Sequence, residues 1–265
     1  MRLALAVTGS ATLLLPLVPG PAVARDELLP ALTRTVRYKD YNQDVQILQE
    51  HLRRWGYSPG PVNGHYGDET RAAVWTFQKV NGLRPRMYVD ERTRDALFAP
   101  VRVRPLVKGA PGRRIEIDLR RRLLVVWKRH RPVVVTHVST GADTHYCDHG
   151  LCGYARTPVG NFRVTRRIKG WHTGRLGAMY YPAFFHGGVA LHGSLSVPRR
   201  KASHGCVRIP MHLARKIYRQ AKVGTPVYVR KPAKPAKASK PTRPAEKPRT
   251  AKPAKTSKPA RSARS

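Results

Sequence analysis

Residues 203–208, with the sequence SHGCVR, place a thiol, an imidazole and a guanidinium close together. The nucleophilic form of cysteine is the thiolate, and an unperturbed thiol is mostly protonated at neutral pH. A nearby imidazole can accept the thiol proton, and a positive charge stabilises the thiolate. The residue types therefore predict covalent catalysis with Cys206 as the nucleophile.

Two histidines are candidates for the base that activates this thiol. His204 precedes Cys206 by two residues, and residues two apart in an extended chain project on the same side. His192, in the segment LHGS at 191–194, is more distant in sequence. Spacing alone favours His204, although a histidine near a cysteine is usually only a packing neighbour.

Groups that would bind a substrate flank the same residues. Gly193 and Gly205 carry no β-carbon, so we expect them to let the backbone approach a substrate closely. The N–H groups of Gly205 and Cys206 are expected to form part of an oxyanion hole. Arg208 is suited to pair with a substrate carboxylate.

The two ends of the chain predict export and a disordered tail. Residues 1–24 combine Arg2, an apolar stretch and the cleavage pattern Ala22-Val23-Ala24, which predicts a secretory signal peptide. The alternative is an uncleaved membrane anchor, but the apolar stretch is short for a span. Residues 231–265 are rich in Lys, Pro and Ala and lack aromatic residues, which predicts disorder.

The formal net charge of +36 predicts a polyanionic partner. For an exported protein this partner would be the cell wall and its anionic polymers, reached through the tail, and nucleic acid is not expected. The alternative is that the tail only keeps the protein soluble. We expect no membrane span after signal cleavage and a secreted, cell-wall-associated location.

The chain has three cysteines, an odd number, which leaves one unpaired in an oxidising compartment. Cys147 and Cys152 are close in sequence, with glycines that allow a tight turn, and are predicted to form a disulfide. Two free thiols, or a metal site that also uses His145 and His149, are the alternatives. On the favoured interpretation, Cys206 is the free thiol.

The carboxy-terminal half is predicted to be mostly β-structure. Residues 115–119 alternate apolar and polar side chains, which indicates a half-buried strand. Residues 123–127 and 133–138 are strand-like, and so are residues 225–230. A helix is expected over 211–221. His137 and His172 have no evident partner. Aromatic residues between these elements would fill a core rather than line a cleft: Trp171, Tyr180, Tyr181, Phe184 and Phe185.

With the upstream His-Gly pair, the SHGCVR segment resembles the motif of the L,D-transpeptidase family. Residues 139–141 (STG) and 157–162 (TPVGNF) are also similar to segments of that family, and the resemblance covers residues 113–230. The loop between the His-Gly pair and Ser203 is shorter than in many members. The resemblance implies a β-sandwich-like catalytic domain that needs no metal or organic cofactor.

The resemblance also implies a role for each matching residue. Cys206 would be the nucleophile and His192, rather than His204, the general base. The carbonyl of Gly193 would orient His192. The remaining residues would shape the thiolate site or contact the substrate: Ser203, His204, Gly205 and Arg208.

Three short helices are predicted upstream of this domain. Apolar residues at 45, 48, 52 and 55 form one helical face. Asp68 is expected to cap the second helix, and the third is expected to begin at Asp90. Residues 41–98 resemble the helical peptidoglycan-binding module, except at 86–88, where the family often repeats a glycine turn. A helical spacer without binding activity is the alternative. Residues 99–112 read as a linker.

The chain is therefore expected to have two domains of α+β class, a three-helix module followed by a mostly β catalytic domain. The signal peptide predicts export, and the resemblance implies an enzyme of peptidoglycan biosynthesis, and hence of cell-wall biogenesis and cell shape. It would release D-alanine from a tetrapeptide stem and form 3→3 cross-links between donor and acceptor stems. The alternatives are L,D-carboxypeptidase activity at the same site, a non-catalytic wall-anchoring protein and a secreted zinc hydrolase.

Overall fold

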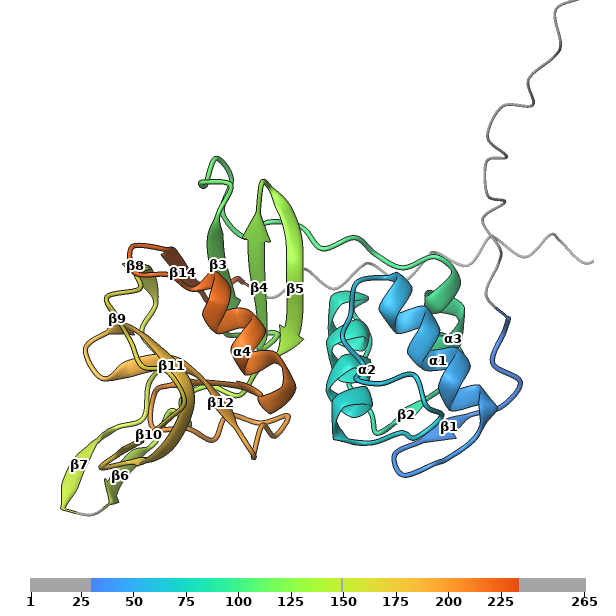
Figure 1. Ribbon diagram of the computed structural model, residues 1–265, viewed down its shortest axis with the longest axis horizontal. Coiled ribbons are helices and arrows are strands. Elements are labelled where there is room, and N and C mark those ends of the chain that lie inside the picture. Colours follow the sequence, from blue (N-terminus) through green and yellow to red (C-terminus); the bar gives the residue numbers. More distant parts are fainter. Residues whose placement is uncertain (1–29, 149, 234–265) are drawn as a thin grey trace, which may run out of the picture. The chain divides into compact units, whose positions relative to one another are not determined.

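The computed structural model describes residues 30–148 and 150–233, and all of these up to Pro232 belong to one compact unit (Figure 1). The predicted signal peptide and nearly all of the predicted basic tail lie outside the described residues. Within the described part of the chain, no helix is long and apolar enough to cross a membrane.

The amino-terminal module contains three helices, α1 (Gln43–Arg54), α2 (Asp68–Val80) and α3 (Glu91–Phe98), and a short antiparallel pair, β1 (Val36–Arg37) and β2 (Tyr88–Val89). The third helix, predicted to begin at Asp90, begins one residue later, and the side chain of Asp90 caps it by accepting a hydrogen bond from Thr93 N at 3.0 Å. The prediction for Asp68 was wrong by one residue. Gly67 is the N-cap of α2 and Asp68 is its first residue, where its charge still favours the positive helix end.

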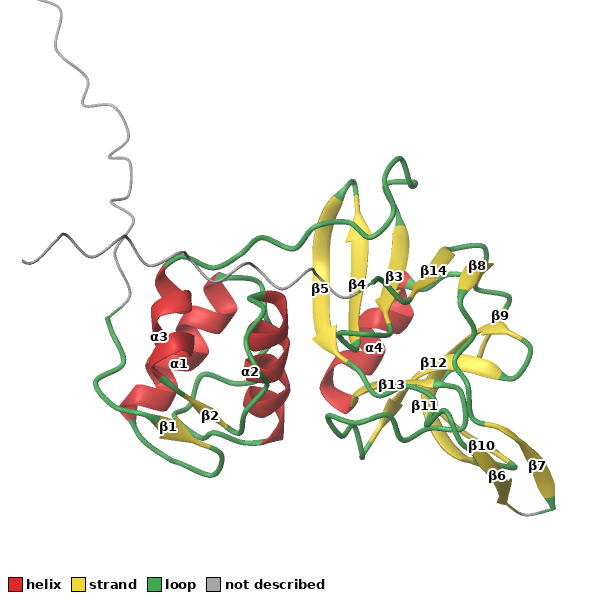
Figure 2. Ribbon diagram, turned by 180° about the vertical axis from the view of Figure 1, so that it is seen from behind, coloured by secondary structure: helices red, strands yellow, loops and turns green. Residues whose placement is uncertain are grey.

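The carboxy-terminal domain contains two five-stranded sheets and one helix, α4 (Met211–Gln220) (Figure 2). The first sheet has the order β5–β4–β3–β14–β8, with the bounds Arg131–His137, Leu123–Lys128, Arg114–Asp118, Pro226–Arg230 and Gly160–Arg163. The second has the order β10–β11–β12–β13, with β9 paired to β11, and the bounds Trp171–Gly174, Gly177–His186, Val189–Ser194, Val207–Pro210 and, for β9, Arg166–Arg167. A separate hairpin is formed by β6 (His145–Asp148) and β7 (Leu151–Tyr154).

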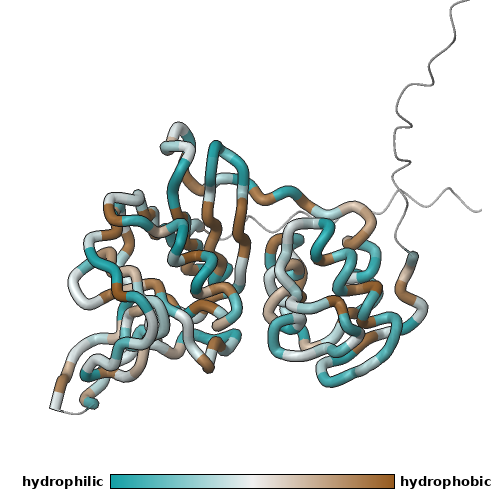
Figure 3. Tube along the Cα trace, viewed as in Figure 1, coloured by the Kyte–Doolittle hydropathy of each residue, from teal (hydrophilic) through white to brown (hydrophobic). Residues whose placement is uncertain are grey.

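One hydrophobic core lies between the two sheets and α4, and a second includes the helical module (Figure 3). Strand β4 contributes to both cores, because alternate residues of a strand project from opposite faces. Leu124 and Val126 belong to the first core, and Leu123, Val125 and Trp127 to the second. This two-sided burial explains why the β4 sequence is apolar without alternation.

Strand β3 differs from its prediction as a half-buried strand, because all five of its residues are buried. Its polar positions are buried with partners. Glu116 accepts hydrogen bonds from Arg114 Nε at 2.7 Å and Trp127 Nε1 at 2.9 Å. A buried carboxylate is tolerated when its oxygens are paired in this way, so the polar residues of the pattern do not mark an exposed face.

Helix α2 contacts strand β5 through polar groups. Thr76 Oγ1 accepts a hydrogen bond from His137 N at 2.8 Å, and Lys79 Nζ lies 2.6 Å from His137 Nδ1. The opposite ring nitrogen of His137 lies 3.2 Å from the carbonyl oxygens of Val197 and Pro198. His137, which had no evident partner in the sequence, therefore joins α2 to the loop between His192 and Cys206.

Candidate active site

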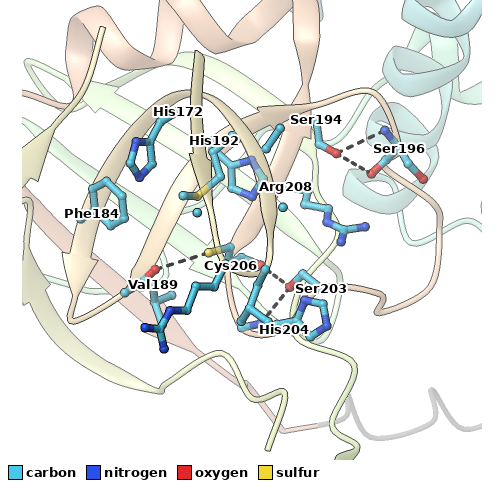
Figure 4. Close-up of a pocket in the computed structure, with 18 of the residues that line it drawn as sticks. His172, Phe184, Val189, His192, Ser194, Ser196, Ser203, His204, Cys206 and Arg208 are labelled. Carbon is cyan, nitrogen blue, oxygen red and sulfur yellow. Dashed lines mark hydrogen bonds between the residues drawn. The ribbon is translucent and has the colours of Figure 1, made fainter. Parts of the chain in front are cut away.

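Two parallel strands position the candidate catalytic residues. Strand β12 pairs with β13 in a register that places His192 opposite Arg208. Cys206 immediately precedes β13 and is two residues before Arg208, so in extended chain both side chains project on the same side. Figure 4 shows His192, Cys206 and Arg208 together at one pocket.

The pocket has a volume of about 690 Å³. His192, Cys206 and Arg208 line it, together with Ser203, His204 and Gly205. Some of the aromatic residues that were predicted to fill a core do so, and others line the pocket. Phe185 is part of the first hydrophobic core, but Trp171 is 54% exposed and lines the pocket, as do Phe184 and His172.

The imidazole of His192 is held in the orientation required of a base. Its Nδ1 lies 3.0 Å from the carbonyl oxygen of Gly193, an acceptor, so Nδ1 carries the proton and Nε2 is left as the basic atom. The pKa of His192 is lowered to about 4, mainly by burial and to a lesser extent by the charge of Arg208, although the hydrogen bond to Gly193 acts to raise it. His192 is therefore neutral at pH 7 and able to accept a proton.

The sulfur of Cys206 lies beside the backbone of strand β12. The N–H of Ala190 points to Sγ at 3.4 Å, and Sγ lies 3.7 Å from the carbonyl oxygen of Gly188. Burial raises the pKa of the Cys206 thiol, whereas the Ala190 N–H and the charge of Arg208 lower it. Because burial is the largest effect, the resting thiol carries its proton and requires a base.

Ser203 and Gly205 form the turn that presents the cysteine. Ser203 Oγ donates to the carbonyl oxygen of Cys206 at 2.5 Å and accepts from Gly205 N at 3.2 Å. Thr157 Oγ1 donates to the carbonyl oxygen of Gly205 at 2.7 Å. Gly205 has a φ of +143°, a conformation that favours glycine, and a β-carbon there would lie 3.1 Å from the carbonyl oxygen of Arg156. Since its N–H is bonded to Ser203, Gly205 is a poor oxyanion donor.

Gly193 has a packing role that the sequence interpretation missed. A β-carbon at this position would lie 2.7 Å from Ala214 Cβ and 3.2 Å from Met211 Sδ, both on α4. The absent side chain therefore makes room for the helix rather than for a substrate. The Gly193 carbonyl, by contrast, bonds the base.

Comparison with known proteins places these residues in a family. A model of the L,D-transpeptidase catalytic domain matches residues 112–229, and a peptidoglycan binding domain model matches residues 41–97. A solved L,D-transpeptidase (residues 123–326) from Xylanimonas cellulosilytica DSM 15894 is 34% identical, with a TM-score of 0.69, over 76% of this chain and 100% of that chain. The chain belongs to the L,D-transpeptidase family. The predicted family and the two-part fold are thereby confirmed.

A second solved structure, an L,D-transpeptidase from Stackebrandtia nassauensis, is 23% identical. The match has a TM-score of 0.44 and covers 73% of this chain and 96% of that chain. No curated protein matches the sequence.

In this L,D-transpeptidase family member, two residues outside the sequence motif contact His204. Its Nε2 lies 2.6 Å from Asp148 Oδ2, and its ring packs edge-on against Tyr146, with centroids 4.6 Å apart. Both partners come from hairpin β6–β7. Sequence reasoning missed them because they precede the motif by more than fifty residues. His204 is thus engaged away from the thiol.

The same hairpin contains the disulfide between Cys147 and Cys152, and Cys206 is the free cysteine. Both thiols of the alternative metal site are therefore joined to each other, and His149 lies outside the described residues. Among the described residues, no group of three or more His, Cys, Asp or Glu side chains could hold a metal ion.

Proposed function

We propose that this family member is an exported enzyme that forms 3→3 cross-links between peptidoglycan stems through a Cys206 thioester. The observation that carries the proposal is the β12–β13 pairing, which brings a neutral His192 and the protonated Cys206 thiol to one pocket beside Arg208. Family membership supports a transpeptidase, and the match to a peptidoglycan binding domain supports peptidoglycan as its partner.

In the first half-reaction, His192 Nε2 accepts the thiol proton as Sγ attacks the carbonyl that joins the third stem residue to its terminal D-alanine. The N–H of Cys206 is the expected donor to the developing oxyanion. When the carbon–nitrogen bond breaks, His192 returns the proton to the leaving amine. D-alanine departs and a thioester to Cys206 remains.

In the second half-reaction, the side-chain amine of a neighbouring stem's third residue attacks the thioester. His192 accepts a proton from this amine and transfers it to the departing sulfur, which restores the thiol. A new amide is the product. Water in place of the amine would release the stem as an acid, which is the L,D-carboxypeptidase reaction. Arg208 is suited to bind a carboxylate of the donor stem in both cases.

The decisive experiment uses the Cys206→Ala variant of the mature protein with a disaccharide tetrapeptide as substrate. Release of D-alanine should fall to background, because no other cysteine among the described residues is free. Release that persists in the variant would disprove the mechanism. Mass spectrometry of the product distinguishes a cross-linked dimer from a hydrolysed stem.

The non-catalytic and zinc-dependent alternatives give different results. The unmodified protein should form a covalent adduct with a carbapenem, seen as a gain in intact mass, and a wall-anchoring protein without activity would not. Activity should survive strong chelation, which would abolish the reaction of a zinc hydrolase.

The location we propose is extracytoplasmic and associated with the cell wall. The matches to peptidoglycan-related domains support it. Export by the predicted signal peptide would bring the enzyme to its substrate, and anionic wall polymers are a further partner proposed for the basic tail.

A further inference from the structure

Hairpin β6–β7 is a two-stranded sheet that pairs with neither of the larger sheets. None of its described residues belongs to either hydrophobic core. Figure 1 shows the hairpin projecting from the rest of the β domain. A two-stranded hairpin on its own is only marginally stable in water, so its place depends on a few specific contacts.

Two of these contacts end on the segment that carries the nucleophile. Asp148 Oδ2 accepts a hydrogen bond from His204 Nε2 at 2.6 Å, and the Tyr146 ring packs edge-on against the same imidazole. At the other end of the hairpin, Tyr154 Oη donates to the carbonyl oxygen of Asp143 at 2.7 Å. His204 is therefore the point where the hairpin meets the catalytic segment.

The hairpin also supplies side chains to the substrate pocket. Tyr146, from β6, and Leu151, from β7, both line it. Cys147 and Cys152 face each other across the two strands, and their disulfide links the strand that holds His204 to the strand that carries Leu151. The proposed base lies in β12 and the proposed nucleophile immediately precedes β13, so the parallel pairing of these two strands also positions both residues.

We propose that hairpin β6–β7 is a wall of the substrate pocket that is closed by its disulfide. Asp148 is the positioning residue that holds this wall against His204. Displacement of the wall weakens binding of the donor stem peptide. The assignment of the donor stem rests on the proposed function. Tyr146 and Leu151 present an aromatic and an aliphatic surface to the pocket, which suits the uncharged parts of a peptide.

The disulfide makes the wall sensitive to reduction. Both cysteines are exposed, so a dithiol reagent can reach the bridge. The sulfur–sulfur bond accepts two electrons and two protons from the dithiol, which becomes a cyclic disulfide, and two protein thiols form. The hairpin then keeps its hydrogen bonds but loses its covalent closure.

The test compares Asp148→Asn and the double variant Cys147→Ser/Cys152→Ser with the unmodified protein. Asp95→Asn is the matched control, because Asp95 is an exposed carboxylate of α3. We expect KM for D-alanine release from a disaccharide tetrapeptide to rise about five- to twentyfold in both test variants, with kcat within about threefold. The control should match the unmodified protein.

A second readout does not require transpeptidase activity. Cys206 is alkylated with iodoacetamide, a small reagent, and in parallel with a bulky fluorophore maleimide. An opened wall should raise the bulky-to-small rate ratio about fivefold or more in both test variants. It should do the same in unmodified protein that has been reduced with dithiothreitol and desalted, an arm that does not require a variant to fold. Because reduction also frees Cys147 and Cys152, alkylation is followed at the Cys206 peptide by mass spectrometry.

An unchanged ratio together with an unchanged KM would overturn the proposal. A collapse of kcat with slow alkylation by iodoacetamide would overturn it too, since Asp148 would then act on the thiol through His204 and not on a wall. If the unmodified protein releases no D-alanine, but the bulky-to-small alkylation ratio still rises in the test variants, the proposed function is wrong and the proposed role of the hairpin as a pocket wall is supported.

Discussion

The neutral state of His192 has a consequence for the pH dependence of the reaction. Its pKa is lowered to about 4, mainly by burial, while its Nδ1 proton is held by the Gly193 carbonyl. The basic atom is therefore unprotonated over a wider acidic range than that of an exposed histidine, whose pKa is about 6.5.

We accordingly expect the acidic limb of the rate profile to lie below pH 5.5. The second-order rate of carbapenem acylation, measured from pH 4 to 8, should show no fall with an apparent pKa near 6.5, since loss of the base begins only as pH approaches about 4. A midpoint near 6.5 would show that an exposed imidazole is the base. His204→Gln serves as the comparison, because it removes the other candidate histidine and should leave the midpoint unchanged.

At the scale of residues, the sequence predicts candidate site residues where these are neighbours in a motif. The SHGCVR segment is sufficient to propose Cys206 as the nucleophile. The choice of His192 over His204 as the proposed base required the family resemblance, because spacing alone favoured His204. The ring of His204 is instead bonded to Asp148. Such a contact depends on where a hairpin folds back, which local spacing does not encode.

At the scale of elements, the contact between α2 and β5 depends on buried polar groups. Lys79 is 6% exposed, and burial lowers its pKa to about 6. Its Nζ donates to His137 Nδ1 and to the carbonyl oxygen of Arg122, at 2.6 and 3.2 Å. His137 in turn bonds the loop that separates His192 from Cys206.

Replacing this lysine should therefore destabilise the protein. Lys79→Ala leaves a buried imidazole nitrogen and a carbonyl oxygen without their donor and creates a cavity, which should lower the free energy of unfolding by about 2–3 kcal/mol. Urea denaturation measures the loss. Lys222→Ala, at an exposed lysine, is the control and should change the free energy by less than about 0.5 kcal/mol. Equal effects of the two substitutions would contradict a role for the buried contacts.

The predicted elements agree with the observed ones where hydrophobic periodicity is strong, as in α1 and α4. The alternating pattern of β3 predicted a half-buried strand, which was wrong. The strand is fully buried because Glu116 is paired with Arg114 and Trp127, which allows its carboxylate to be buried. The parallel pairing of β12 with β13 was not predicted either. A parallel register is set by the connection and by packing against other layers, not by the two strand sequences.

At the scale of the whole molecule, two buried histidines make stability depend on pH. Burial lowers the pKa of His137 to about 3 and that of His192 to about 4. Below an unfolded-state pKa of about 6.5, the unfolded chain binds protons that the folded protein does not, so stability falls as pH falls. Lys79 acts in the same direction at neutral pH, because its pKa is lowered as well.

We expect the free energy of unfolding to be lower at pH 5 than at pH 7 by up to about 2 kcal/mol for each of the two histidines. Urea denaturation at both pH values measures the difference. His192→Gln should reduce the difference by up to about 2 kcal/mol, since glutamine does not titrate and the contributions of His137 and Lys79 remain. A stability that is unchanged, or that rises on acidification, would contradict the neutral state of these side chains.

The other whole-molecule prediction concerns the basic tail, which lies almost entirely outside the described residues. Truncation after Arg230 should weaken binding to isolated cell walls at low salt, because the tail contributes much of the net charge of +36. Cosedimentation of the two proteins with walls measures binding, and the difference should diminish at high salt, where exposed charges are screened. Equal binding at low salt would exclude adhesion by the tail.

The close packing of Gly193 against α4 restricts the position of the proposed catalytic base, His192, from a second side. His192 lines the pocket, while a β-carbon on the next residue along β12, Gly193, would lie only 2.7 Å from Ala214 Cβ and 3.2 Å from Met211 Sδ, so there is no room for one more carbon. A larger residue at 214 would push on β12 from the side opposite the pocket. A helix that contributes no residue to the pocket lining therefore limits where the proposed base can sit, and we expect substitutions there to alter activity without changing any residue that lines the pocket.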